Sequence, residues 1–283
     1  MRRTPRAPGA FPLRKDVVAW AEKLVGKGAF QWDEDAVWDG LIRPLDGYAR
    51  RADAGLPATL ASLLLETAGQ NPRAHAALLA SLRFWTAGGV LAEETLGGEP
   101  ASSHRRPFYL AADVGSALTL SMTAQNMSRF FIFNRLEKTD TKTRISLHRE
   151  ASREMTAWSV GLGCRFASRG EGSPPSRAAF LSMARCSTVA CGLRLAVSWT
   201  SELFPKLSCA VPALHEFCGA ISVSLALARE RRRREGGQAR GWKEFIEAES
   251  SHWRGEALRL AAVSGLGDGF ALKLTRIAKQ SCR

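Results

Sequence analysis

Apolar residues recur at helical spacing in successive segments of this chain, and most of these segments end at glycine or proline. The segment Leu56–Ala68 is one of them: Pro57 suits a first helical turn, leucines follow at helical intervals, and Gly69 comes directly after it. A second segment starts at Asn71-Pro72 and is predicted to stop at Gly88-Gly89. Because such segments return along the whole chain, the sequence predicts a mainly α-helical protein.

One part of the N-terminal half has the composition of a β-hairpin instead. Val90–Glu94 and Pro107–Ala111 are short strand candidates, and residues 96–103 (LGGEPASS) have the composition of a turn. Helical spacing resumes after Asp113. We therefore predict a helical protein with a small winged β-hairpin in its N-terminal half.

Turn-forming residues divide the chain most clearly at residues 168–176 (SRGEGSPPS). The division predicts a basic flexible arm at residues 1–15, a helical domain at 16–167 and a basic helical domain at 177–283. The arm contains three prolines and no acidic residue. It is interpreted as an organellar transit peptide, as an arm that reaches onto nucleic acid, or as a plain disordered terminus.

Basic charge is the largest departure from an average composition. The chain has 40 Lys and Arg residues against 27 Asp and Glu residues, a formal net charge of +13. Residues 120–283 hold 26 basic and 14 acidic side chains, and the N-terminal arm holds five basic side chains. Charge of this kind favours association with polyanions but does not specify a fold. We predict a polyanionic partner.

Residues 35–120 show the order helix, helix, tight turn, helix, strand, basic loop, strand, helix. The stretches PATLASLLLETAGQNPRAHAALLASLRFWTAGGVLAEE and HRRPFYLAADVGSAL carry this order. In this order of elements, the two stretches resemble the winged helix-turn-helix DNA-binding domains of MarR- and PadR-type regulators. The resemblance implies a recognition helix, a wing and DNA binding. On the residues alone, a helical hairpin followed by a surface β-hairpin is the alternative.

The resemblance assigns nucleic-acid contacts to two groups of side chains, one entering the major groove and one meeting phosphate or the minor groove. These are Arg73, His75 and Ser81 on the predicted recognition helix, and His104, Arg105 and Arg106 at the tip of the wing.

A run of arginines within residues 229–235 (RERRRRE) is a separate candidate for anion binding. Basic residues at the end of a helix complement its dipole, which is the alternative explanation. Four consecutive arginines exceed that need, so Arg231, Arg232, Arg233 and Arg234 are predicted to contact phosphate.

Six cysteines occur in a chain that shows no secretory signal, which predicts free and mostly buried thiols. Cys209, His215 and Cys218, with Cys186 or Cys191, could supply four zinc ligands. Their spacing lacks the close pairs of usual zinc sites. We therefore predict neither a bound metal nor a cofactor.

Residues 207–228 (LSCAVPALHEFCGAISVSLALA) form the longest apolar stretch. Pro212, His215 and Glu216 interrupt it, and the uninterrupted remainder is too short to cross a bilayer. A buried helix is the preferred interpretation, and a membrane contact at 207–228 is the weaker one.

Catalytic motifs are absent from the sequence. No serine lies in a Gly-x-Ser-x-Gly elbow, His215-Glu216 has no second histidine at metalloprotease spacing, and Gly265–Gly269 has the character of a turn rather than a phosphate loop. These observations predict that the chain is not an enzyme.

Together the features predict a nucleic-acid-binding protein that contacts DNA rather than RNA, either a transcriptional regulator or a replication-type protein. The alternative is a non-catalytic basic subunit of a large assembly, such as an organellar ribosome or an organellar membrane complex. Self-association or membership of a larger assembly is part of this prediction. The expected location is the cytoplasm or the nucleoid, with a mitochondrion or plastid as the alternative.

Overall fold

In the computed structural model, residues 52–97, 125, 128, 139–169, 186–234 and 242–281 are described. Their α-helices are α4 (Ala52–Thr67), α5 (Ala76–Gly97), α7 (Thr141–Arg169), α9 (Thr188–Leu203), α10 (Val211–Arg234), α11 (Trp242–Ser264) and α12 (Asp268–Ser281), with 3-10 helices η2 (Pro72–His75) and η4 (Pro205–Ala210). No strand occurs among these residues. The predicted mainly helical class is confirmed, and the predicted β-hairpin finds no support.

The predicted strand at Val90–Glu94 is wrong, because these residues continue helix α5 through Gly88-Gly89. The reason lies in the neighbouring helix rather than in the local sequence. A β-carbon on Gly89 would lie 2.5 Å from Cγ2 and 2.7 Å from Oγ1 of Thr188. The predicted helix stop at Gly88-Gly89 is therefore wrong, and Gly89 instead allows α5 to approach the start of α9 closely. The second strand candidate, Pro107–Ala111, lies outside the described residues.

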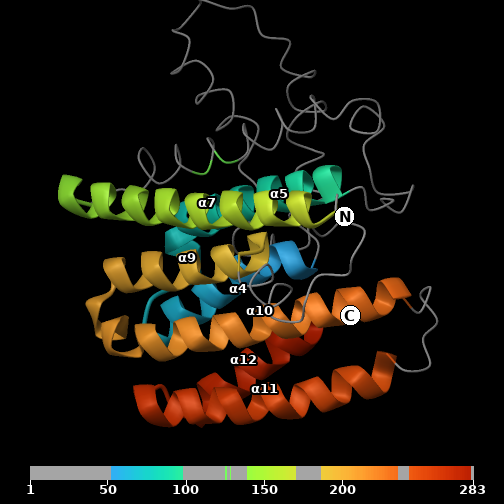
Figure 1. The fold of residues 1–283 in the computed structure, drawn as a ribbon. Helices are drawn as coiled ribbons and strands as arrows, with labels where there is room; N and C mark the ends of the chain where they lie inside the picture. Colours follow the sequence, from blue (N-terminus) through green and yellow to red (C-terminus); the bar gives the residue numbers. More distant parts are fainter. Residues whose placement is uncertain are drawn as a thin grey trace, which may run out of the picture.

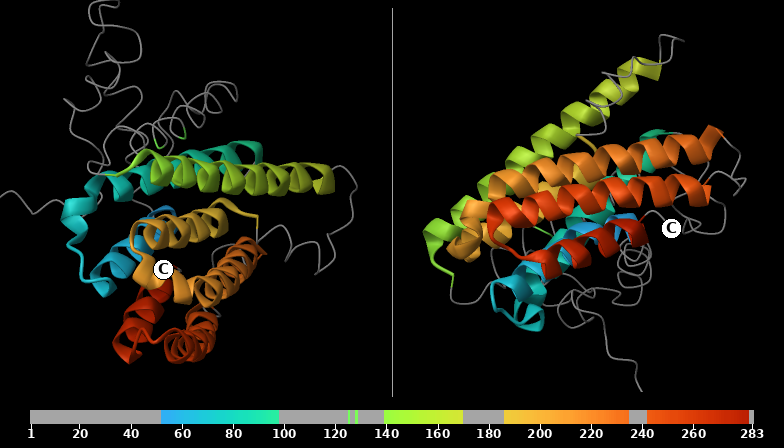
Figure 2. Two further views of the ribbon diagram at one scale, coloured as in Figure 1. Left: turned by 90° about the vertical axis from the view of Figure 1, so that its left-hand side faces the viewer. Right: turned by 90° about the horizontal axis from the view of Figure 1, so that it is seen from below.

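Helix α9 is the central element of the described bundle (Figures 1 and 2). It packs against α4, α5, α7 and α10, and most of its residues are buried. Its first turn is capped twice: the Ser187 hydroxyl accepts from the Ala190 N–H at 3.3 Å, and Glu93 Oε1 accepts from the Thr188 N–H at 2.6 Å. A carboxylate at this position also offsets the positive end of the helix dipole.

The helices lie in three layers, with α5 and α7 on one side, α4 and α9 in the middle, and α10, α11 and α12 on the other (Figure 1). One core joins α4 to the C-terminal helices around Leu60, Leu193 and Trp253. A second core joins α4, α5, α7 and α9 around Trp85 and Trp199. The domain division at residues 168–176 stays a prediction.

Glycines with positive φ end two helices where the sequence predicted turns. Gly69, after α4, has φ 76°, and Gly265 and Gly267, between α11 and α12, have φ 67° and 75°. Glycine adopts this backbone region without the steric cost that a side chain brings.

The apolar stretch 207–228 is divided between η4 and α10. Leu207, Leu214, Phe217 and Ile221 are buried in the core that contains Trp253. Among the described helices, none combines the length and the apolar character that crossing a bilayer requires.

Candidate functional site

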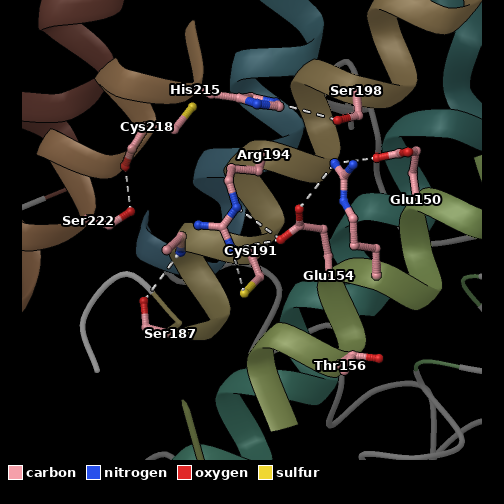
Figure 3. Close-up of polar contacts among 12 residues, drawn as sticks. Glu150, Glu154, Thr156, Ser187, Cys191, Arg194, Ser198, His215, Cys218 and Ser222 are labelled. Carbon is pink, nitrogen blue, oxygen red and sulfur yellow. Dashed lines mark hydrogen bonds and ion pairs between the residues drawn. The ribbon is translucent and has the colours of Figure 1, made fainter. Parts of the chain in front are cut away.

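A buried ion pair between Glu154 of α7 and Arg194 of α9 forms the centre of a polar cluster (Figure 3). Nε and Nη2 of Arg194 donate to Glu154 Oε2 at 3.0 Å and 2.7 Å. The Glu154 side chain is 4% exposed and the Arg194 side chain is 20% exposed. Charges this far from water are held only with close partners, so each fixes the position of the other.

The cluster extends from this pair toward solvent along α7. Nη2 of Arg153 lies 2.5 Å from Glu150 Oε2 and 3.7 Å from Glu154 Oε1. Arg153 is exposed, whereas Glu150 is half-buried. Two carboxylates and two guanidinium groups therefore form one chain of contacts, in the order Glu150, Arg153, Glu154, Arg194.

Two thiols line the inner end of the cluster. Cys191 Sγ accepts from Arg194 Nη2 at 3.1 Å, and burial raises the pKa of the Cys191 thiol although the Arg194 charge opposes the change. Burial also raises the pKa of Cys218 to about 12. Both cysteines are therefore protonated at neutral pH and serve as small polarisable packing groups rather than as nucleophiles.

His215 of α10 borders the cluster on its other side. Its Nε2 lies 3.5 Å from the Ser198 hydroxyl of α9 (Figure 3). Burial lowers the pKa of His215; the charge of Glu154 opposes this effect, and the charges of Arg194 and Arg153 add to it. The imidazole is consequently neutral at pH 7.

This histidine makes stability depend on pH. Above pH 6.5 His215 is mostly neutral in both the folded and the unfolded chain. As the pH falls below 6.5, the unfolded chain binds a proton that the folded protein resists, so the free energy of unfolding decreases. His75, whose pKa is also lowered by burial, adds to the same loss. Urea unfolding at pH 7.5 and pH 5 should show a smaller loss for His215→Gln than for the parent, and an unchanged loss would contradict this assignment.

The structure separates the residues that were predicted to contact DNA. Arg73 is exposed in η2, and His75 is half-buried with its ring edge-to-face on Phe204 at 5.1 Å between centroids. Ser81 is fully buried and donates to the Ala77 carbonyl at 2.8 Å, so it faces the core instead of the surface.

The wing-tip residues His104, Arg105 and Arg106 lie outside the described residues. Arg231, Arg232, Arg233 and Arg234 form the last turn of α10, and their side chains lie outside the described ones.

The sequence contains one signal of the polar cluster, and it is not a motif with a short spacing. Arg194 is the only charged residue between Cys186 and Ser201, in a segment that is otherwise apolar or small. A lone charge on a helix of that kind requires a buried partner. The partner, Glu154, lies 40 residues earlier in the chain and could not be identified by spacing.

The zinc ligand set considered from the sequence is not assembled in the described residues. No group of three or more His, Cys, Asp or Glu side chains able to hold a metal ion is found in the described part of the chain. Cys209 is exposed, whereas Cys218 is buried.

Comparison with known proteins shows a likeness in fold. No protein-family model matches the chain, and no curated protein matches it in sequence. Among solved structures, it is similar to a crystal structure of a geranylgeranyl pyrophosphate synthase, with a TM-score of 0.56 and 11% sequence identity. The match covers 96% of this chain and 86% of that one. At this identity the likeness shows a shared helical fold.

This likeness corrects four predictions. The winged helix-turn-helix is wrong, because the helices of residues 52–97 belong to a larger helical fold with no strand among the described residues. The DNA-binding function implied by that resemblance is contradicted with it, and the alternative of a basic assembly subunit is unsupported. The prediction that the chain is not an enzyme is also contradicted, since a solved structure with a similar fold is an enzyme, a geranylgeranyl pyrophosphate synthase.

Proposed function

We propose that the protein is an enzyme of the prenyltransferase class, which binds an isoprenoid diphosphate. The observation that carries the proposal is the likeness in fold to a geranylgeranyl pyrophosphate synthase, because it extends over 96% of this chain and 86% of that one. A likeness of that extent covers the whole helical arrangement and not a shared helix pair.

The polar cluster has the chemistry that a diphosphate needs. Phosphate oxygens accept well from guanidinium groups, which present several N–H donors in a fixed plane. Arg153 is the exposed member of the cluster, and Arg194 lies behind it. Glu150 and Glu154, one helical turn apart, hold these two side chains in place.

The helices that carry the cluster also contribute side chains to a buried apolar core. Leu147 and Trp158 of α7 and Leu195 and Trp199 of α9 belong to one buried apolar group. Ligand sites in helical bundles combine such apolar walls with a few converging polar groups. In the reaction class proposed, the bond between the isoprenoid carbon and the diphosphate oxygen breaks, and its electron pair leaves with the diphosphate. The double bond of isopentenyl diphosphate supplies the electron pair for the new carbon–carbon bond, and loss of a proton restores a double bond. Fixed positive charge near those oxygens stabilises the developing negative charge.

The test is turnover of an allylic isoprenoid diphosphate with isopentenyl diphosphate in the presence of Mg²⁺, measured as chain-extended product and released diphosphate. Calorimetric titration with the same diphosphates measures binding separately. We expect both for the parent protein. If the parent protein neither binds nor turns over isoprenoid diphosphates of five to twenty carbons, the proposal is overturned.

A matched pair of variants tests the role of the cluster. The double variant Glu154→Leu with Arg194→Met replaces the buried ion pair by apolar side chains of similar size, which retains the packing of α7 on α9. It should keep the native circular dichroism spectrum and lose at least about tenfold in diphosphate affinity, the effect of one strong charge-assisted contact. The control, Glu216→Leu with Arg259→Met, removes an exposed interhelical ion pair and should bind as the parent does.

A further inference from the structure

The outward side of α7 carries one continuous row of exposed residues. Over residues 142–163 these recur three or four positions apart, the spacing of one face of a helix. The row consists of Lys142, Ile145, Arg149, Arg153, Thr156, Val160 and Gly163. Helix α7 lies at one edge of the described bundle (Figures 1 and 2). Its buried residues Leu147, Ala151 and Trp158 belong to the core shared with α9, so the exposed row points away from α9.

Charge on this row is entirely positive. The acidic residues of α7 between residues 142 and 163 are Glu150 and Glu154, and both are turned inward and paired with arginines. Asp140, just before the helix, caps its first turn by accepting from the Thr143 N–H at 2.9 Å. Lys142 and Arg149 make no ion pair within the described part of the chain.

Two large apolar side chains of the same row are unusually exposed, one between Lys142 and Arg149 and one beyond Arg153. Ile145 is 50% exposed and Val160 is 57% exposed. Fifteen residues of helix separate them by about 22 Å along the axis. The other large apolar side chains of comparable exposure in the described chain, Val263 and Leu272, lie on α11 and α12.

We propose that this face of α7 binds an anionic lipid surface, with Lys142 and Arg149 at the headgroups and Ile145 and Val160 inserted just below them. A helix that lies in a membrane interface presents apolar side chains toward the acyl boundary and basic side chains to anionic lipids. The row on α7 has both, and its span from residue 142 to residue 163 gives a straight contact of about 32 Å. The inference does not depend on the proposed enzymatic function.

Co-sedimentation of the full chain with vesicles tests it. The parent should bind vesicles of phosphatidylcholine with phosphatidylglycerol, should bind phosphatidylcholine vesicles much less, and should be released by high salt. Lys142→Glu with Arg149→Glu should weaken binding by at least about tenfold, because each basic residue near an anionic surface contributes several-fold. Ile145→Ser with Val160→Ser should also weaken it several-fold.

Matched controls distinguish vesicle binding by this face of α7 from binding by exposed basic or apolar residues elsewhere. Arg254→Glu with Arg276→Glu changes two exposed basic residues on α11 and α12, and Val263→Ser with Leu272→Ser changes the two exposed apolar residues there. Both controls should bind as the parent does. Equal losses in the controls and the α7 variants, vesicle binding that either α7 variant leaves intact, or no binding to anionic vesicles would each overturn the proposal.

Discussion

Replacing Glu154 by alanine is expected to lower the free energy of unfolding by about 3 kcal/mol, because it leaves a mostly buried guanidinium without its carboxylate. Nε and Nη2 of Arg194 both donate to Glu154, and the Arg194 side chain is 20% exposed. Water therefore reaches this charge poorly and cannot replace the lost partner. Equilibrium unfolding in urea, followed by circular dichroism, measures the change.

The control is a glutamate that pairs with an arginine on another helix but at the surface. Glu216 of α10 lies 3.1 Å from Arg259 of α11, and their side chains are 67% and 53% exposed. Glu216→Ala should cost less than about 1 kcal/mol, as exposed ion pairs do. Equal costs for Glu154→Ala and Glu216→Ala would show that the Glu154–Arg194 pair is not buried as described.

The double variant Glu154→Leu with Arg194→Met distinguishes charge from packing. Apolar replacement of a whole buried ion pair is close to neutral, so its stability should return to within about 1 kcal/mol of the parent. A double variant as unstable as Glu154→Ala would mean that the pair stabilises the protein by its fit between α7 and α9 rather than by the compensation of its two charges. The same double variant is the one that should lose diphosphate binding, so stability and function can be read separately.

Gly89→Ala is expected to destabilise the protein by about 2 kcal/mol, although alanine favours a helix by about 1 kcal/mol over glycine. The added β-carbon would lie 2.5 Å from Cγ2 and 2.7 Å from Oγ1 of Thr188, and rotation about χ1 of Thr188 can relieve only one of the two overlaps. Helices α5 and α9 would have to separate. Thermal unfolding and urea unfolding both report the loss.

Two companion variants test the cause. Thr188→Ala removes both overlapping atoms, so in its background Gly89→Ala should cost much less than it does alone. A β-carbon added to Gly163 in α7 would meet no packed neighbour within 4 Å, so Gly163→Ala should stabilise the protein by roughly 0.5–1 kcal/mol. No relief from Thr188→Ala would contradict the close packing of α5 on α9. A destabilised Gly163→Ala would show that alanine is costly at a helical glycine of this protein even without a close neighbour.

The cluster around Arg194 shows what a chain alone cannot reveal. The apolar character of residues 186–201 predicts a buried helix, and a single arginine within it predicts a partner. The partner is fixed by how α7 crosses α9, which brings together residues 40 positions apart. Motifs are recognised by short spacings, so they pointed to the exposed Arg73 and the buried Ser81 and not to Glu154.

The sequence by itself determined where several helices lie and end. Helical spacing located α4, although the helix begins at Ala52 and Pro57 lies inside it rather than in its first turn. Gly69, Gly265 and Gly267 ended helices because only glycine adopts positive φ at little cost. These are local properties, decided by neighbours within one or two turns. The tertiary structure alone decided whether Gly88-Gly89 stops a helix or lets two helices touch, since that depends on Thr188, nearly 100 residues later. It also decided that α4 and α5 belong to a large helical bundle and not to a winged helix, because packing between distant helices, and not their order along the chain, defines the fold.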